Sequence, residues 1–195
     1  MRIGEVKKSF RKDESGAALL EMSVVFPVLL TISLGVIEFG NAIYSQHLVF
    51  NGVRDAARYV AGLPFMDSAF VSPDTVKVAA NKVAGKNIAV WGTTTTTDTC
   101  DNSSTAAMKL TRRVSWWCNA AQVSIDYVPL ADSKTNICGS VASPAYCRGR
   151  DKGGNVYTVT VTATVPYQQL GFLSYLGLIA PTLNVSHTER VYGVR

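Results

Sequence analysis

Gly16-Ala-Ala-Leu-Leu-Glu21-Met-Ser-Val-Val-Phe-Pro27-Val-Leu-Leu-Thr-Ile-Ser-Leu-Gly-Val-Ile37 is the stretch of sequence that decides the fold. From residue 17 to residue 37 it contains a single charged residue, Glu21. At about 1.5 Å of rise per residue, a helix of this length extends roughly 31 Å, which matches a hydrocarbon core of about 30 Å. The sequence therefore predicts a transmembrane helix at residues 17–37.

The charges on either side of this helix predict its orientation. The leader, residues 1–16, carries a net charge of +2, whereas the stretch after the helix, through Gln46, holds Glu38 and no Lys or Arg. By the positive-inside rule the N-terminus is cytoplasmic and the C-terminal bulk is exported. A removable signal peptide is the weaker interpretation because the apolar run is long and Gly40-Asn41-Ala42 is a poor cleavage site. The leader's basic residues are Arg2, Lys7, Lys8, Arg11 and Lys12.

Two residues are unusual for a simple anchor. Glu21 lies one turn into the apolar run, where an ionised carboxylate costs about 2.5–3.5 kcal/mol near a helix centre. Pro27 removes the hydrogen bond from its own amide to the Ser23 carbonyl, and we expect it to kink the helix. Glu21 therefore either reaches out to the membrane interface or has a partner.

A candidate partner for Glu21 follows from the residues before the helix. The charged leader ends in Asp13-Glu14-Ser15-Gly16, and Glu21 is the fifth residue after Gly16. Cleavage after Gly16 would leave a free amine on Ala17, and helix positions i and i+4 share a face. Amine and carboxylate could then pair within one chain or between neighbouring subunits. This layout resembles the class III signal peptide of type IV pilin-like proteins, which a prepilin peptidase cuts on the cytoplasmic side.

Further motifs resemble those of the TadE-like family of tight-adherence (Tad/Flp) pilus systems. The resemblance covers about residues 16–61, returns weakly in 159–167 and 183–191, and is not visible in 89–151. Met22 departs from the aromatic residue that follows the Glu in the short major pilins of these systems. The motifs are Gly16-Ala-Ala-Leu-Leu-Glu21, Val25-Phe-Pro27, Gly35-Val-Ile-Glu-Phe-Gly40 and Val53-Arg-Asp-Ala-Ala-Arg-Tyr59.

The resemblance implies a minor pilin, or pseudopilin, of a type IVc pilus. Such a protein would be processed between Gly16 and Ala17, stored in the bacterial inner membrane, and incorporated at one end of a filament to initiate or cap assembly. Glu21 would set the register. The implied partners are other pilins and pseudopilins, the prepilin peptidase and the inner-membrane assembly platform. The alternative is a single-pass membrane-anchored binding protein, periplasmic or at the cell surface, that never enters a filament.

The helix is expected to continue beyond the membrane as an amphipathic extension over residues 38–62. Apolar residues recur at helical spacing, and Gly62-Leu63-Pro64 ends the pattern. Two helices broken near residues 35–40 are the alternative. The expected apolar face consists of Phe39, Ile43, Phe50, Val53, Ala57 and Val60.

Residues 63–195 are predicted to form an exported α+β domain. Ser72-Pro73-Asp74 predicts a helix N-terminus, with an apolar stripe of Val76, Ala79, Ala80 and Val83 and an end at Gly85. Strands are expected at 88–91, 121–128, 156–165 and 183–191, the last two pairing antiparallel. The expected fold class is therefore α+β, a long N-terminal helix (transmembrane, then amphipathic) packed on a small antiparallel sheet with disulfide-bearing loops.

The four cysteines indicate an oxidising compartment. Three pairings are possible, and local bridges joining Cys100 to Cys118 and Cys138 to Cys147 are favoured. Free buried thiols are the alternative. A metal site is disfavoured because no two cysteines stand two to four residues apart and the histidines are isolated.

Catalysis and nucleic-acid binding are not indicated. The chain shows no nucleophile elbow, phosphate-binding glycine loop or HExxH motif, and we expect no cofactor. The net charge of +5 leaves only +3 beyond the leader, too diffuse for a nucleic-acid surface. We expect at least one of Trp116 and Trp117 in the core. The apolar loop 171–181 docks on the domain or meets a partner subunit.

Overall fold

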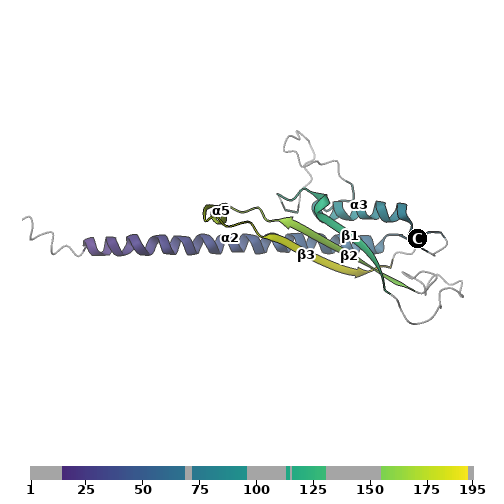
Figure 1. Ribbon diagram of the computed structural model, residues 1–195, viewed down its shortest axis with the longest axis horizontal. Helices are drawn as coiled ribbons and strands as arrows, with labels where there is room; N and C mark the ends of the chain where they lie inside the picture. Colours follow the sequence, from purple (N-terminus) through teal and green to yellow (C-terminus); the bar gives the residue numbers. More distant parts are fainter. Residues whose placement is uncertain (1–14, 69–71, 96–112, 115, 131–154, 193–195) are drawn as a thin grey trace, which may run out of the picture. The chain divides into compact units, whose positions relative to one another are not determined.

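The computed structural model describes residues 15–68, 72–95, 113–114, 116–130 and 155–192. Its helices are α2 (Ser15–Gly62), α3 (Thr75–Trp91), the 3-10 turn η1 (Ala120–Gln122) and α5 (Phe172–Tyr175), and its strands are β1 (Val123–Leu130), β2 (Val156–Pro166) and β3 (Thr182–Arg190) (Figure 1). This is the predicted α+β layout. The chain divides into two compact units. We call Met1–Ala42 with Gln169–Ile179 the helix unit, and Ile43–Gln168 with Ala180–Arg195 the sheet unit.

Helix α2 runs without a break for 48 residues, so the alternative of two helices is wrong. Pro27 lies inside it. The helix ends where Gly62-Leu63-Pro64 was expected to end it, with the Leu63 N–H donating to the Val60 carbonyl at 3.2 Å. Part of α2 therefore belongs to each unit.

The sheet has the strand order β1-β2-β3, with both pairs antiparallel. Val159, Val161, Ala163 and Val165 of β2 are buried and alternate with threonines, as in a strand with one face on the core. Three of the four predicted strands are present and end within two residues of the observed ones, and β1 starts later because η1 occupies the preceding residues. Asn119 caps η1, its side-chain oxygen accepting the Ala121 N–H at 2.9 Å.

The β2–β3 hairpin is closed one step beyond its last paired residues. The Tyr167 N–H donates to the Pro181 carbonyl at 3.0 Å. The intervening loop, residues 169–179, belongs to the helix unit.

Helix α3 differs from its prediction. Its N-cap is Asp74, two residues later than expected, whose carboxylate accepts the Val76 and Lys77 N–H groups at 2.9 and 3.3 Å. The predicted apolar stripe is exposed, with Val76 at 75% and Val83 at 60%. The buried residues are instead Asn81, Gly85, Ile88, Ala89, Val90 and Trp91.

Gly85 does not end α3, and residues 88–91 are helical rather than a strand. A Cβ at residue 85 would lie 2.5 Å from Cγ2 of Val60 and 2.6 Å from Cδ1 of Ile125. Glycine therefore allows α3 to approach α2 and β1 closely. The residue that ends α3 is Gly92, in the left-handed region with φ 77°, whose N–H donates to the Ile88 carbonyl at 2.9 Å.

The core of the sheet unit lies among α2, α3 and the strands. Val53, Ala57 and Val60 of α2 are fully buried, as predicted, whereas Phe39 and Ile43 are exposed, which corrects the start of the expected apolar face. Phe65 stacks on Tyr127 with ring centroids 5.3 Å apart. The buried polar residue Asn81 donates to the Pro64 carbonyl at 2.9 Å and to the Tyr127 hydroxyl at 3.3 Å.

Candidate functional site

The predicted processing and register residues lie in the first two turns of α2. Because α2 begins at Ser15, the bond between Gly16 and Ala17 falls in its first turn, and nothing lies within 4 Å of a Cβ placed on Gly16. Ala17 and Glu21 are both exposed and share a face one turn apart. The geometry permits the proposed pairing of a new N-terminal amine with Glu21, which stays a prediction.

The segment that follows exposes a continuous apolar surface. Among the described residues, α2 is the one helix that is both long enough and apolar enough to span a membrane. Its most apolar 18-residue window has a mean hydropathy of 2.1, and none of that window is buried in the structure. A surface of this kind needs an apolar environment, a bilayer or other helices. The most exposed large residues of residues 17–37 are Leu19, Leu20, Val24, Val36, Met22, Ile32 and Ile37.

The hydroxyl groups of this segment are satisfied within α2. Thr31 Oγ1 donates to the Pro27 carbonyl at 2.7 Å, Ser23 Oγ to the Leu20 carbonyl at 2.7 Å, and Ser33 Oγ to the Leu29 carbonyl at 2.8 Å. Such bonds lower the cost of hydroxyls in an apolar medium. The expected kink at Pro27 stays a prediction.

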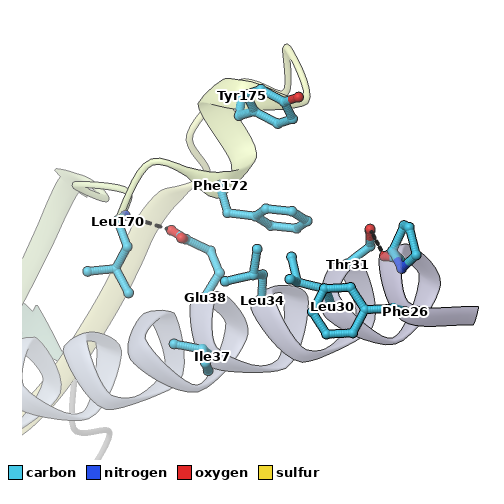
Figure 2. A pocket seen from close by; sticks show the side chains of 10 residues that line it. Phe26, Leu30, Thr31, Leu34, Ile37, Glu38, Leu170, Phe172 and Tyr175 are labelled. Carbon is cyan, nitrogen blue, oxygen red and sulfur yellow. Dashed lines mark hydrogen bonds between the residues drawn. The ribbon is translucent and has the colours of Figure 1, made fainter. Parts of the chain in front are cut away.

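Glu38 joins α2 to the loop 169–179 inside the helix unit. Its side chain is only 3% exposed, and Oε1 accepts the Leu170 N–H at 2.9 Å (Figure 2). A hydrogen bond to a carboxylate is stronger than one between neutral groups. Sequence reasoning placed Glu38 in a family motif but missed this contact, because 132 positions separate the two residues.

An open groove of about 630 Å³ lies between α2 and this loop. The Phe172 ring lies between α5 and α2, whereas Tyr175 stands on α5 farther from α2 (Figure 2). Phe172 Cε1 is 3.8 Å from where a Gly35 Cβ would be, so the ring rests against α2. The lining is apolar apart from Thr31, Glu38 and the Tyr175 hydroxyl, and its other residues are Phe26, Pro27, Leu30, Leu34, Ile37, Leu170 and Phe172.

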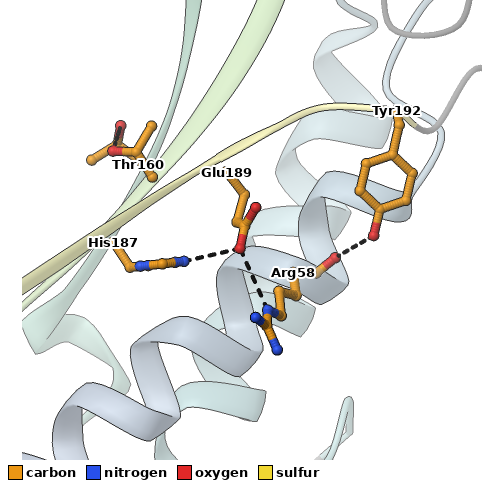
Figure 3. A network of polar contacts seen from close by, with 6 residues as sticks. Arg58, Thr160, His187, Glu189 and Tyr192 are labelled. Atoms are coloured by element: carbon orange, nitrogen blue, oxygen red, sulfur yellow. Dashed lines mark hydrogen bonds and ion pairs between the residues drawn. The ribbon is translucent and has the colours of Figure 1, made fainter.

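A polar network in the sheet unit fastens β3 to α2 (Figure 3). Glu189 Oε1 lies 2.9 Å from His187 Nε2 and 3.4 Å from Arg58 Nε, and the Tyr192 hydroxyl donates to the Arg58 carbonyl at 3.3 Å. The hydrogen bond with His187, and then Arg58, hold the pKa of Glu189 below its usual value. This arrangement suits a fastening role between helix and strand.

The adjacent tryptophans and Cys118 lie in the segment before η1. Trp117 is buried, confirming that at least one of the pair is core, and Trp116 meets Tyr167 edge to face at 6.2 Å. Cys118 lies beside Trp117. Cys100, Cys138 and Cys147 lie outside the described residues, so both bridges stay predictions. Within the described part of the chain, no three His, Cys, Asp or Glu side chains gather as metal ligands would.

Comparisons with known proteins agree with the motif analysis. Residues 16–58 match the family model described as TadE-like protein. The match covers the apolar segment of α2 and most of its extension, including Glu21, Pro27 and Glu38. Searches of curated proteins and of solved structures returned no match.

Proposed function

We propose, from the family match and the form of α2, that the protein is a minor pilin (pseudopilin) of a tight-adherence type IVc pilus. A prepilin peptidase cleaves it between Gly16 and Ala17. It is stored in the bacterial inner membrane with its N-terminus cytoplasmic and the sheet unit in the periplasm. It then joins other pilins at one end of a filament, through the inner-membrane assembly platform.

The observation that carries this proposal is that the two parts of one helix have different surroundings. The apolar side chains of the first part of α2 are exposed, whereas the part beyond residue 48 is buried in the sheet unit through Val49, Val53, Ala57 and Val60. The exposed apolar part suits two environments in turn, a bilayer before assembly and a bundle of neighbouring helices afterwards.

Glu21 is the register element in this proposal. A carboxylate at this depth is strongly destabilised unless it is paired, and removing one partner of a buried pair typically costs about 3–5 kcal/mol. A neighbour's amine at Ala17 is available only after cleavage. Processing would therefore be required before Glu21 can direct a subunit into position.

Two experiments test the proposal. N-terminal sequencing of the protein extracted from membranes of piliated cells should begin at Ala17; a chain that still begins at Met1 would contradict processing. Glu21→Ala should still be cleaved but should fail to support pili. Ser23→Ala, in the same helical turn, is the control: it should be cleaved and should support normal pili. Normal pili with Glu21→Ala would refute the register role.

A further inference from the structure

The loop 169–179 has a composition unlike that of an exposed hairpin loop. It contains no Asp, Glu, Lys or Arg. Several of its apolar side chains are largely exposed, with Ile179 at 93%, Tyr175 at 88% and Leu170 at 62%. A loop facing water would normally be polar, so these side chains call for an apolar covering.

The position of the loop along α2 indicates what covers it. Phe172 rests against Gly35, and Leu170 is bonded to Glu38, at the end of the predicted membrane span. The groove lining extends back along α2 from Glu38 to Phe26, twelve residues or about 18 Å of helix. The groove thus joins the loop to the exposed apolar segment of α2.

The backbone of the loop is suited to a medium with little water. Tyr175 N–H donates to the Gly171 carbonyl at 2.9 Å, and Leu178 N–H to the Leu173 carbonyl at 2.9 Å. Leu176 and Gly177 also donate within the loop, to Phe172 and Ser174. With Leu170 held by Glu38, these bonds reduce the penalty for leaving water.

We infer that the loop 169–179 is a second membrane contact, inserted at the headgroup–acyl boundary of the periplasmic leaflet. Tyr175 lies at the interface, where aromatic side chains concentrate. The occupant of the groove between α5 and α2 is a phospholipid acyl chain. This inference rests on the membrane anchoring in the proposed function and adds a lipid-binding surface to it. The loop shields the Glu38 carboxylate at the point where α2 leaves the bilayer.

Tryptophan reporters in the full-length protein test this. The protein is reconstituted in nanodiscs of phosphatidylethanolamine with a minority of phosphatidylglycerol, with and without a mixture of lipids brominated near the top and near the end of their acyl chains, so that both the interface and the middle of the bilayer are covered. The native tryptophans, Trp91, Trp116 and Trp117, belong to the sheet unit and provide the background. Tyr175→Trp and Ile179→Trp report on the loop.

Two matched variants of α2 separate the possible outcomes. Phe26→Trp reports on the anchor, and Tyr59→Trp on the sheet unit. We expect brominated lipid to remove the added emission of both loop reporters about as strongly as that of Phe26→Trp, and to leave that of Tyr59→Trp.

If Phe26→Trp is quenched but neither loop reporter is, the lipid contact is refuted and the anchor stands. Aqueous iodide then tells whether water or a protein neighbour covers the loop. If Phe26→Trp itself is not quenched, both the anchor and the loop contact fail.

Discussion

Gly52 is the position at which the packing of α2 against α3 can be tested most directly. A Cβ on residue 52 would collide with the backbone carbonyl oxygen of Ala89 and would lie 3.0 Å from Cδ of Arg113. Overpacking costs about 1–3 kcal/mol, and the upper end applies here because a backbone atom cannot rotate away. Alanine recovers about 1 kcal/mol of helix propensity. We therefore expect Gly52→Ala to lower the free energy of unfolding by about 2 kcal/mol.

The assay is thermal unfolding of the full-length protein in detergent micelles, followed by near-UV circular dichroism. At about 2–4 °C per kcal/mol for a chain of this size, Tm should fall by roughly 4–8 °C. Gly40→Ala is the matched control, since it lies in the same helix with nothing within 4 Å of the new Cβ. Equal Tm values for the two variants would refute the close approach of α2 to α3.

Three further predictions concern polar groups. Asn81→Ala should destabilise the protein by about 1–3 kcal/mol because it leaves buried acceptors unsatisfied, whereas Asn87→Ala on the same helix removes only a solvent-exposed bond to the Thr94 carbonyl and should have little effect in chemical denaturation. The lowered pKa of Glu189 contributes stability that is complete above the usual glutamate pKa and is lost as the pH falls through the lowered value; Glu189→Gln should remove this part of the dependence of Tm on pH. Glu38→Leu should speed hydrogen exchange at Leu170 and through α5, whereas Glu38→Gln, which keeps an acceptor oxygen, should not; equal exchange in both variants would show that this bond does not hold the loop.

The long helix and the strands were predictable because their signals are local. Residues 17–37 are apolar over a length that only a membrane-spanning or fully buried helix needs. In β2, valines and threonines alternate with period two, which fixes which side chains face the core. The burial of Val161 therefore follows from the sequence pattern alone. The antiparallel pairing of β2 and β3 was also predicted correctly.

The errors in α3 have a common physical origin. A glycine such as Gly85 can either end a helix or allow it to pack closely against a neighbour, and the sequence does not distinguish the two roles. Only the positions of Val60 and Ile125 in the fold decide which applies. Residues 88–91 form a short apolar run, and periodicity cannot separate a short strand from a buried turn of helix. Val76 was assigned to the core by spacing, but the contacts of α3 are concentrated toward its C-terminal end.

The groove was not predictable from the sequence. Glu38 stands in one of the motifs that resemble the TadE-like family, but nothing near it in sequence identifies Leu170 as its partner. The sequence showed that loop 171–181 is apolar and predicted that it docks on the domain or meets a partner subunit. Its docking on α2 depends on a contact between distant parts of the chain, and such contacts leave no local periodicity.

The hydrogen bond between Tyr167 and Pro181 separates the loop that connects β2 and β3 from the sheet itself. Because the hairpin is already closed at that pair, the length of this loop affects the register of the sheet very little. Doubling a flexible loop adds only about 0.6 kcal/mol of closure entropy. If the loop contacts the membrane as inferred above, its length could therefore differ to suit a thicker or thinner bilayer without any change in the register of the sheet.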